Sequence, residues 1–333
     1  MTSNSGGATS EEDFRRLVEP HRAELHAHCY RILGSVHDAE DALQEALLRA
    51  WRSLPRFEGR SSLRSWLYRI ATNTSLDLLA RRRKRVLPID FGPASDPHDE
   101  SDQPVVESVW VEPYPDEKLG VEDGFAAPEA RYERRESVEL AFIAAVQHLP
   151  ATQRAVLILR DVLGFSAREA AETLETTVNS VNSALRRARS AADKRLPEQS
   201  QQVTLRALGD DGVRELVEGY MDALERADID AIIAMLAEEA TWSMPPYASW
   251  YRGHEAITGF LTAGPFRERW RHLPAHANGQ PAVGCYLWDV RRGSYVAAVL
   301  DVLTLRGERI TEVTGFVTPG VFRRFGLPDE LPA

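Results

Sequence analysis

The sequence predicts a multidomain protein in which two all-α segments are followed by an α+β domain. In the first two thirds of the chain, apolar residues recur at helical spacing, as in DAEDALQEALLRAW. After residue 205, two helical patterns lead into ATWSMP, CYLWDV, SYVAAVLDVLTLR and RITEVTGFVTP, which are typical of strands. The last three are expected to form one antiparallel sheet. A chain of 333 residues is long enough for several domains, each with its own core.

Charge divides the chain at similar places. Residues 1–85 hold 15 basic and 11 acidic residues, and residues 86–133 hold 2 and 13. Residues 134–196 hold 10 and 7, and the remainder holds 13 and 19. A net charge of -10 therefore hides two basic segments, and local patches control contact with phosphate. We expect a disordered N-terminus (1–12), a helical domain (13–85), an acidic Pro-rich linker (86–133), a helix-turn-helix domain (134–196) and an α+β domain (205–328).

Several classes of protein are disfavoured by simple counts. No apolar run is long enough to cross a bilayer, and the polar N-terminus does not resemble a signal peptide, so we expect a cytoplasmic protein without membrane contact. The two cysteines, Cys29 and Cys285, lie far apart and indicate neither a disulfide framework nor a zinc site. We expect no metal and no cofactor.

The stretch DAEDALQEALLRAW predicts an amphipathic helix with Asp38 as its N-cap. Its apolar residues face a core, and its polar face carries Asp41, Gln44, Glu45 and Arg49. Periodicity alone interprets that face as solvated.

Next comes FEGRSS, a loop with one glycine, and a long helix from about Leu63. Cations and aromatic residues alternate along it and suit single-stranded DNA, whose bases can be unstacked and held. Cations at a helix end also serve as caps, but the run from Arg81 to Arg85 exceeds that need and favours phosphate contact. The candidate DNA contacts are Arg60, Ser61, Ser62, Arg64, Asn73, Arg81 and Arg82.

The segment GFSAREAAETLETTVNSVNSALRRAR predicts two short helices joined by a tight turn. Ser166 and Glu169 form a capping box, and Thr177 caps the second helix. Short polar groups precede arginines on the exposed face of that helix, as in a recognition helix that enters a major groove. A plain helical core with a basic face is the alternative. The candidate base or phosphate contacts are Asn179, Ser180, Ser183, Arg186 and Arg187.

Together the two basic segments resemble a sigma factor of bacterial RNA polymerase, of the extracytoplasmic-function type. The resemblance covers residues 13–196 and rests on DAEDALQEALLRAWRSLPRFEGRSSLRSWLYRIATNTSLDLLARRRKR and on LPATQRAVLILRDVLGFSAREAAETL with VNSALRRAR. It implies that Asp41, Gln44, Glu45 and Arg49 bind the polymerase core. It also implies that FEGRSS and the helix bearing Asn73 capture the minus-ten element, and that 178–189 reads the minus-thirty-five element.

Within the linker, SVWVEPYPDEKL is an apolar run in polar surroundings. It is either a short strand-like piece docked on a neighbouring domain or an anchor that sets how the domains are arranged. Trp110 and Tyr114 are its candidate interdomain contacts.

Residues 212–318 resemble the SnoaL-like family, cone-shaped α+β domains whose members include polyketide cyclases. ALERADIDAIIAMLAEEATWSMPP and YRGHEAITGFL carry the resemblance, and His254 is expected to cap the helix after Gly253. Such cones enclose an apolar pocket, although a simple core explains most of its candidate residues singly. The pocket candidates are Trp242, Met244, Trp250, Tyr251, Trp288 and Asp301.

A buried Asp301 would have a raised pKa and could act as a general base, but nothing in the sequence pairs it with a second group. We therefore expect no catalytic residues. The fused architecture implies that the cone contacts the sigma domains and regulates them within one chain. The main hypothesis is a sigma factor that binds core RNA polymerase and promoter DNA. An enzyme or ligand sensor in the cone, with an unknown small molecule, and a DNA-binding regulator acting without polymerase are the alternatives.

Overall fold

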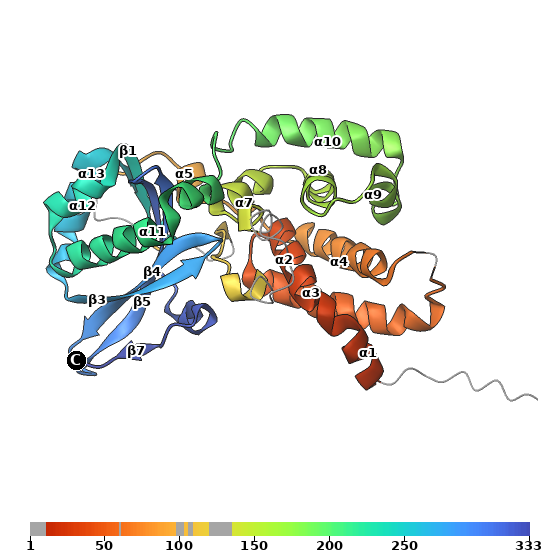
Figure 1. Ribbon diagram of the computed structural model, residues 1–333, viewed down its shortest axis with the longest axis horizontal. Coiled ribbons are helices and arrows are strands. Elements are labelled where there is room, and N and C mark those ends of the chain that lie inside the picture. Colours follow the sequence, from red (N-terminus) through yellow and green to blue (C-terminus); the bar gives the residue numbers. More distant parts are fainter. Residues whose placement is uncertain (1–10, 60, 98–102, 106–108, 120–134) are drawn as a thin grey trace, which may run out of the picture. The chain divides into compact units, whose positions relative to one another are not determined.

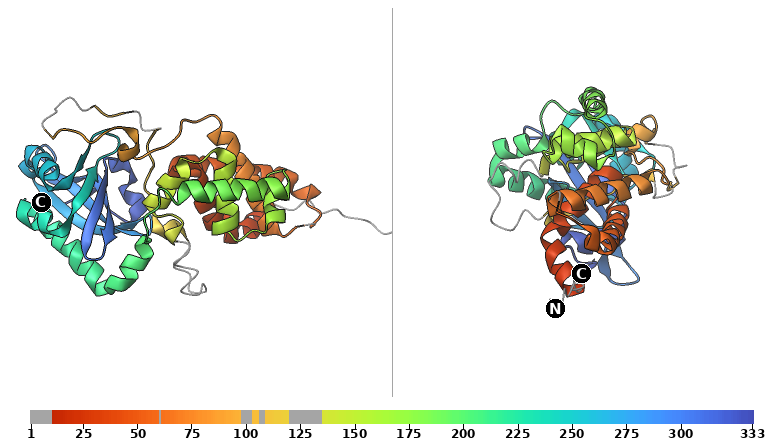
Figure 2. Two further views of the ribbon diagram at one scale, coloured as in Figure 1. Left: turned by 90° about the horizontal axis from the view of Figure 1, so that it is seen from above. Right: turned by 90° about the vertical axis from the view of Figure 1, so that its right-hand side faces the viewer.

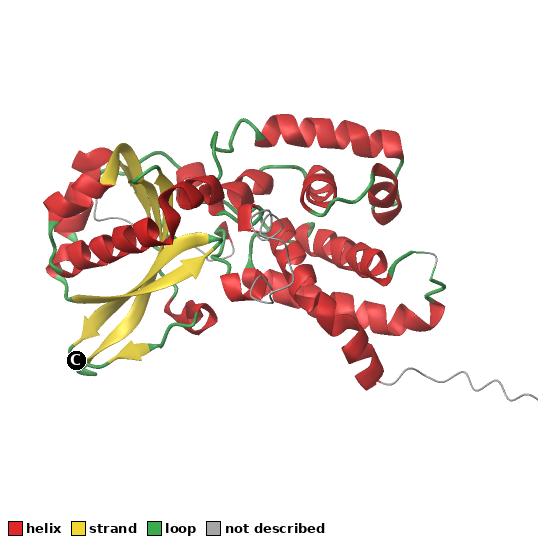
Figure 3. Cartoon of the chain, viewed as in Figure 1, coloured by secondary structure: helices red, strands yellow, loops and turns green. Residues whose placement is uncertain are grey.

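The computed structural model describes residues 11–59, 61–97, 103–105, 109–119 and 135–333. The chain forms two compact units. The N-terminal unit comprises residues 1–82, 118–120 and 149–194, and the C-terminal unit comprises residues 83–117, 121–148 and 195–333. Among the described residues, the named strands all belong to the C-terminal unit (Figure 3). Residues 1–10 of the expected disordered N-terminus lie outside the description, and Glu11 already begins a helix.

Two groups of helices build the N-terminal unit (Figure 1). The first group is α1 (Glu11–Val18), α2 (Arg22–Leu33), α3 (Val36–Ser53) and α4 (Leu63–Leu79). The second is α8 (Ala151–Leu157), a π-helical turn (Ile158–Val162), α9 (Ala167–Thr173) and α10 (Val178–Ala192). The groups pack through α2 and α4 against α8 and α9. Buried Arg154 joins them, because its guanidinium donates to the carbonyl of Ile32 at 2.5 Å.

Side-chain caps set the helix starts in this unit. Ser35, and not Asp38, is the N-cap of α3, because its Oγ accepts from the amide of Asp38. The prediction for Asp38 was therefore wrong by one turn. The capping box of Ser166 and Glu169 and the cap at Thr177 are confirmed.

The turn between α9 and α10 has no glycine. Glu175 takes its place with a φ of 51°, in the left-handed region. The amide of Thr176 donates to the carbonyl of Ala171, which closes the end of α9 in the pattern of a Schellman motif. The helix-turn-helix therefore forms without a glycine in its turn, and Glu175 bears the strain of the left-handed backbone.

A seven-stranded mixed sheet forms the core of the C-terminal unit, in the order β2-β1-β6-β5-β4-β3, with β7 paired to β5. The expected antiparallel pairing of β4, β5 and β6 is confirmed, whereas β1 pairs with β6 in parallel. The strands are β1 (Leu236–Ser243), β2 (Trp250–Arg252), β3 (Trp270–Ala277), β4 (Gln280–Asp289), β5 (Ser294–Arg306), β6 (Arg309–Phe316) and β7 (Glu330–Leu331).

Helices cover this sheet (Figure 2). They are α11 (Gln201–Glu225), α12 (Ile229–Met235) and α13 (Gly253–Ala263), and α11 contacts β3, β4 and β5. The expected cap at Asp228 is confirmed. The expected cap at His254 is wrong, because its Nε2 lies 3.0 Å from the carbonyl oxygen of Ala237. In α11 the backbone of Gly209 is non-helical, so the helix is kinked there.

The chain between the two helical groups is fastened to the C-terminal unit. This tether, residues 83–148, includes α5 (Pro88–Phe91) and α7 (Leu140–Gln147), and residues 118–120 within it belong to the N-terminal unit. It runs along β2, where the amide of Ser95 donates to the carbonyl of Trp250 at 2.8 Å. It then reaches the β3–β4 turn, where the amide of Tyr114 donates to Oδ1 of Asn278 at 2.8 Å. The C-terminal unit thus contains most of the linker that the sequence places outside any domain.

Candidate nucleic-acid interface

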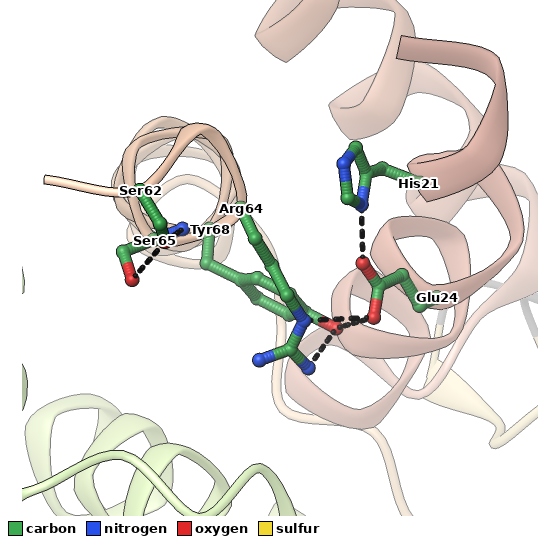
Figure 4. A network of polar contacts seen from close by, with 6 residues as sticks. All are labelled: His21, Glu24, Ser62, Arg64, Ser65 and Tyr68. Carbon is green, nitrogen blue, oxygen red and sulfur yellow. Dashed lines mark hydrogen bonds and ion pairs between the residues drawn. The ribbon is translucent and has the colours of Figure 1, made fainter. Parts of the chain in front are cut away.

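The N-terminal half of α4 carries the candidate contacts for single-stranded DNA. Ser62 caps the helix, because its Oγ accepts from the amide of Ser65, and Ser61 and Ser62 are exposed. Arg64 is held by its own unit (Figure 4): its Nε donates to Glu24 at 3.1 Å and its guanidinium lies 4.7 Å from the ring centre of Tyr68. Arg60 lies outside the described residues.

Glu24 is the centre of this network. It also accepts from the hydroxyl of Tyr68 at 3.1 Å and lies 2.7 Å from Nδ1 of His21. Burial, and secondarily the Glu24 charge, raises the pKa of Tyr68, so its hydroxyl stays protonated and donates. The hydrogen bonds therefore keep the Arg64 side chain against α2.

A hollow of about 320 Å³ adjoins α4. Ser62, Ser65 and Arg69 line one side of it, and Arg168, Glu169 and Glu172 of α9 line the other. Hydrogen bonds at Ser166 lower the pKa of Glu169, so this carboxylate is ionised. The hollow thus holds two arginines and two glutamates, and Arg168 pairs with Glu172 at 2.9 Å, so its charges are paired within the protein in this conformation.

The basic run after α4 divides into exposed and buried residues. Arg81 and Arg82 are exposed, and Arg82 pairs with Asp38 at 3.3 Å. Arg85 is buried and donates to the carbonyl of Trp110 at 2.7 Å. Asn73 is partly buried in the middle of α4. The run is thus partly structural, which the charge count alone did not reveal.

On α10 the predicted recognition face is open to solvent. Asn179, Ser180, Arg186 and Arg187 are exposed, and Ser183 is partly buried. The opposite stripe, with Val181, Leu185 and Ala188, is buried. Arg189, which no prediction selected, forms a two-bond pair with Asp161 at 2.6 and 2.8 Å. Arg186 and Arg189 also line a groove beside Arg160.

The candidate polymerase face of α3 is polar with one apolar exception. Asp41 and Gln44 are exposed, and Glu45 and Arg49 are partly buried and joined by a 2.8 Å hydrogen bond. Leu48 lies one turn beyond Gln44 and is 50% exposed. The sequence analysis did not select Leu48, although the helical spacing of the sequence gives its position among these polar residues.

Trp110 and Tyr114 are both buried in the C-terminal unit. Trp110 forms a bridge with Val86 and lies 5.2 Å from Phe91, measured between ring centres. The carbonyl of Tyr114 accepts from the amide of Asn278 at 2.8 Å. The backbone of Tyr114 therefore joins the tether to the β3–β4 turn, whereas these contacts of Trp110 lie within the tether itself.

A cavity of about 360 Å³ opens inside the curved sheet. Of the predicted pocket residues, Trp242, Met244 and Asp301 line it. Trp250, Tyr251 and Trp288 are not among its lining residues. Trp250 donates instead to the carbonyl of Gly92, Tyr251 stacks on Phe260, and Trp288 packs on Tyr295. No group of metal-binding side chains is found among the described residues.

Comparison with known proteins places these features in families. Residues 17–85 match the model of Sigma-70 region 2, residues 139–191 that of Sigma-70 region 4, and residues 217–313 that of the SnoaL-like domain. The ECF RNA polymerase sigma factor SigG of Mycobacterium tuberculosis is 42% identical over 99% of this chain and 89% of its own length. This chain belongs to the ECF RNA polymerase sigma factors.

Other sigma factors match less of the chain. SigE of Mycolicibacterium smegmatis is 30% identical over 56% of this sigma factor and 62% of its own length. The crystal structure of SigJ of M. tuberculosis has a TM-score of 0.57 and 22% identity, and covers 94% of this chain and 99% of that one. The latter likeness shows a shared fold. The predicted family and the fused SnoaL-like domain are confirmed.

Proposed function

We propose that this sigma factor binds core RNA polymerase, directs promoter-specific initiation of transcription, and is regulated by its own C-terminal unit. Relatives named as RNA polymerase sigma factors support the first two parts. The observation that supports the third is the tether. Residues 83–148 connect the two DNA-contacting groups of helices and are hydrogen-bonded to the C-terminal unit.

Promoter geometry requires the N-terminal unit to open. Elements at minus ten and minus thirty-five lie about 25 base pairs apart, or about 85 Å along B-DNA. In the structure α4 contacts α9, and α10, which follows α9 after a short turn, is only about 22 Å long. The two groups cannot reach both elements while they remain packed together. We infer that the compact form precedes promoter binding.

The two groups of helices can separate only if the tether that joins them is free to extend. A free tether of this length could extend to about 220 Å at about 3.3 Å per residue, which is more than twice the promoter distance. Its bonds to the C-terminal unit shorten the free part. The amide of Leu140 donates to Gln280 at 2.9 Å, and the amide of Gly279 donates to Asp116 at 2.8 Å. The docked tether therefore favours the closed unit and restrains initiation.

Transcription by reconstituted polymerase tests this proposal. Asn278→Gly keeps the left-handed backbone of Asn278, whose φ is 57°, and removes the side chain that bonds Tyr114 and Val138. We expect more transcripts than from the natural chain at the same promoters of a genomic fragment library. Ala227→Gly is the matched control, since Ala227 has a φ of 52° on an exposed turn. Equal output from both variants would exclude regulation by the tether, and no transcript from any chain would exclude sigma activity.

The domain limits 13–85, 134–196 and 205–328 and the assigned DNA and polymerase contacts remain part of this proposal. We also propose that the protein acts at the polymerase in the cytoplasm and is not an enzyme. No helix in the described part of the chain is long and apolar enough to span a membrane. The structure gives Asp301 a hydrogen-bonding partner that the sequence did not reveal, the hydroxyl of Tyr220 at 2.9 Å, but this pair alone does not assign a reaction.

A further inference from the structure

The walls of the cavity in the SnoaL-like domain combine aromatic rings with carboxylates. Aromatic rings form much of the cavity, and none of its lining residues is lysine or arginine. Its carboxylates are Asp301, inside, and Glu268, which is exposed. The volume of about 360 Å³ lies in the range of about 300–1,000 Å³ that small-molecule pockets occupy. The rings are those of Trp242, Tyr247, Phe260, Phe266 and Trp270.

Asp301 is only half satisfied by the protein. The hydroxyl of Tyr220 donates to its Oδ2 at 2.9 Å, and Sγ of Cys285 lies 3.4 Å from the same oxygen. Burial raises the pKa of Tyr220 and of Cys285, so both remain protonated donors. No described residue donates a hydrogen bond to Oδ1. It lies against Gly315, where a Cβ atom would come within 2.8 Å of it.

No lysine or arginine lines the cavity to neutralise the carboxylate of Asp301. Burial raises the pKa of Asp301 to about 6, so the ionised form still predominates at neutral pH. The neighbouring His272 is neutral there, because burial lowers its pKa to about 4. A buried carboxylate without a cation is unfavourable, and a ligand that brings a positive charge removes that cost.

We propose that this cavity binds an apolar organic amine in its protonated form, with the ammonium group on Oδ1 of Asp301 and the apolar part between the aromatic rings. Aromatic rings attract cations through their faces, and a carboxylate adds a charge-assisted hydrogen bond. Glu268 adds a second carboxylate to the lining, and its exposed neighbours Arg267 and Arg269 are not lining residues. Anionic ligands are excluded by both carboxylates, and neutral ones lose the ammonium contacts.

Three probes of one shape and different charge test this assignment. They are 2-naphthylmethylamine, 2-naphthylmethanol and 2-naphthoate, titrated into the full-length protein at pH 7.5 with calorimetry as the readout. We expect the amine to bind at least tenfold more tightly than the alcohol, and the carboxylate not to bind. Equal binding of amine and alcohol, preference for 2-naphthoate, or no binding by any probe would overturn the proposal.

Variants connect the binding to the two carboxylates. Asp301→Asn should lower amine affinity at least tenfold and leave the alcohol unchanged. Because a buried substitution can impair folding, exposed Glu268→Lys is a second variant, and it should weaken the amine and strengthen 2-naphthoate. Glu308→Gln, on the exposed turn between β5 and β6, is the control for lost negative charge and should change nothing. An unaltered amine affinity in both test variants would contradict the assignment.

Discussion

Nε of Arg64 donates to Oε2 of Glu24 across 3.1 Å, so a guanidinium assigned to promoter DNA is paired within its own helical unit (Figure 4). The pair is partly exposed, with 42% of the Arg64 side chain and 26% of the Glu24 side chain accessible. Its strength is therefore modest, and DNA phosphate can compete for the arginine once the unit opens.

Glu24→Gln should release Arg64 and keep an acceptor for the hydroxyl of Tyr68. We expect the polymerase holoenzyme with this variant to bind a single-stranded minus-ten oligonucleotide up to about fivefold more tightly, because a pair of this kind contributes about 1 kcal/mol or less. Fluorescence anisotropy measures the affinity. Glu11→Gln removes the exposed pair with Arg15 and serves as the control. Weaker binding by Glu24→Gln would show that Glu24 supports the DNA-bound form.

A second prediction concerns the helix-turn-helix turn. Glu175→Gly should stabilise the N-terminal unit by about 1 kcal/mol, because glycine avoids the left-handed strain that glutamate bears at φ 51°. Urea unfolding followed by circular dichroism measures this. Gly164→Ala is the reverse test: φ is 70° and no atom lies within 4 Å of an added Cβ, so only backbone strain changes. A loss of stability in Glu175→Gly would mean that its side chain has a compensating role.

The elements that the sequence predicted well are those whose caps are local. Each of these caps is a hydrogen bond between residues three positions apart, so the local sequence suffices to predict it. The caps are Ser166 with Glu169, Thr177 and Asp228. Asp38 was chosen wrongly because Ser35 offers the same chemistry one turn earlier. Periodicity does not distinguish between two capping residues that lie one turn apart.

Long-range features escaped the sequence for a different reason. Strand β3, which contains Pro274 and two histidines, lacks an apolar alternation and is specified by pairing with β4. Arg85 looked like part of a phosphate-binding run, and its bond to Trp110 depends on a contact 25 residues away. Similarly, Trp242 and Asp301 could be selected for the cavity, but the orientation of Trp250 away from it follows from the docked tether.

The third prediction is a pH dependence at Glu139, which accepts from the amide of Gln202 at 3.0 Å. Burial raises its pKa from 4.5 to about 7. A raised acid pKa means that the folded chain holds the proton more tightly, so this contribution is complete below pH 4.5 and lost as pH rises to about 7. Glu139→Gln should remove it and raise stability at pH 8 by on the order of 3 kcal/mol.

Unfolding of the C-terminal unit at pH 5 and pH 8 measures this change. The difference between the two pH values should be smaller in Glu139→Gln than in the natural chain. Glu308→Gln, which is exposed, should leave the difference unaltered. An identical pH profile for Glu139→Gln and the natural chain would show that Glu139 is ionised in the fold at pH 5.

The last prediction separates tether release from damage to the C-terminal unit. Gly259 lies within α13, and a Cβ there would come within 2.9 Å of Cγ of Pro97 in the tether. Gly259→Ala should displace Pro97 while favouring the helix by about 1 kcal/mol. We therefore expect transcription by the holoenzyme to rise without a fall in the melting temperature. Gly212→Ala in α11 gives the same helical gain, with its nearest contact at an ordinary 3.6 Å from Leu208, and should leave transcription unchanged. If both variants raise transcription equally, stiffening of the helices, and not the tether, is the cause.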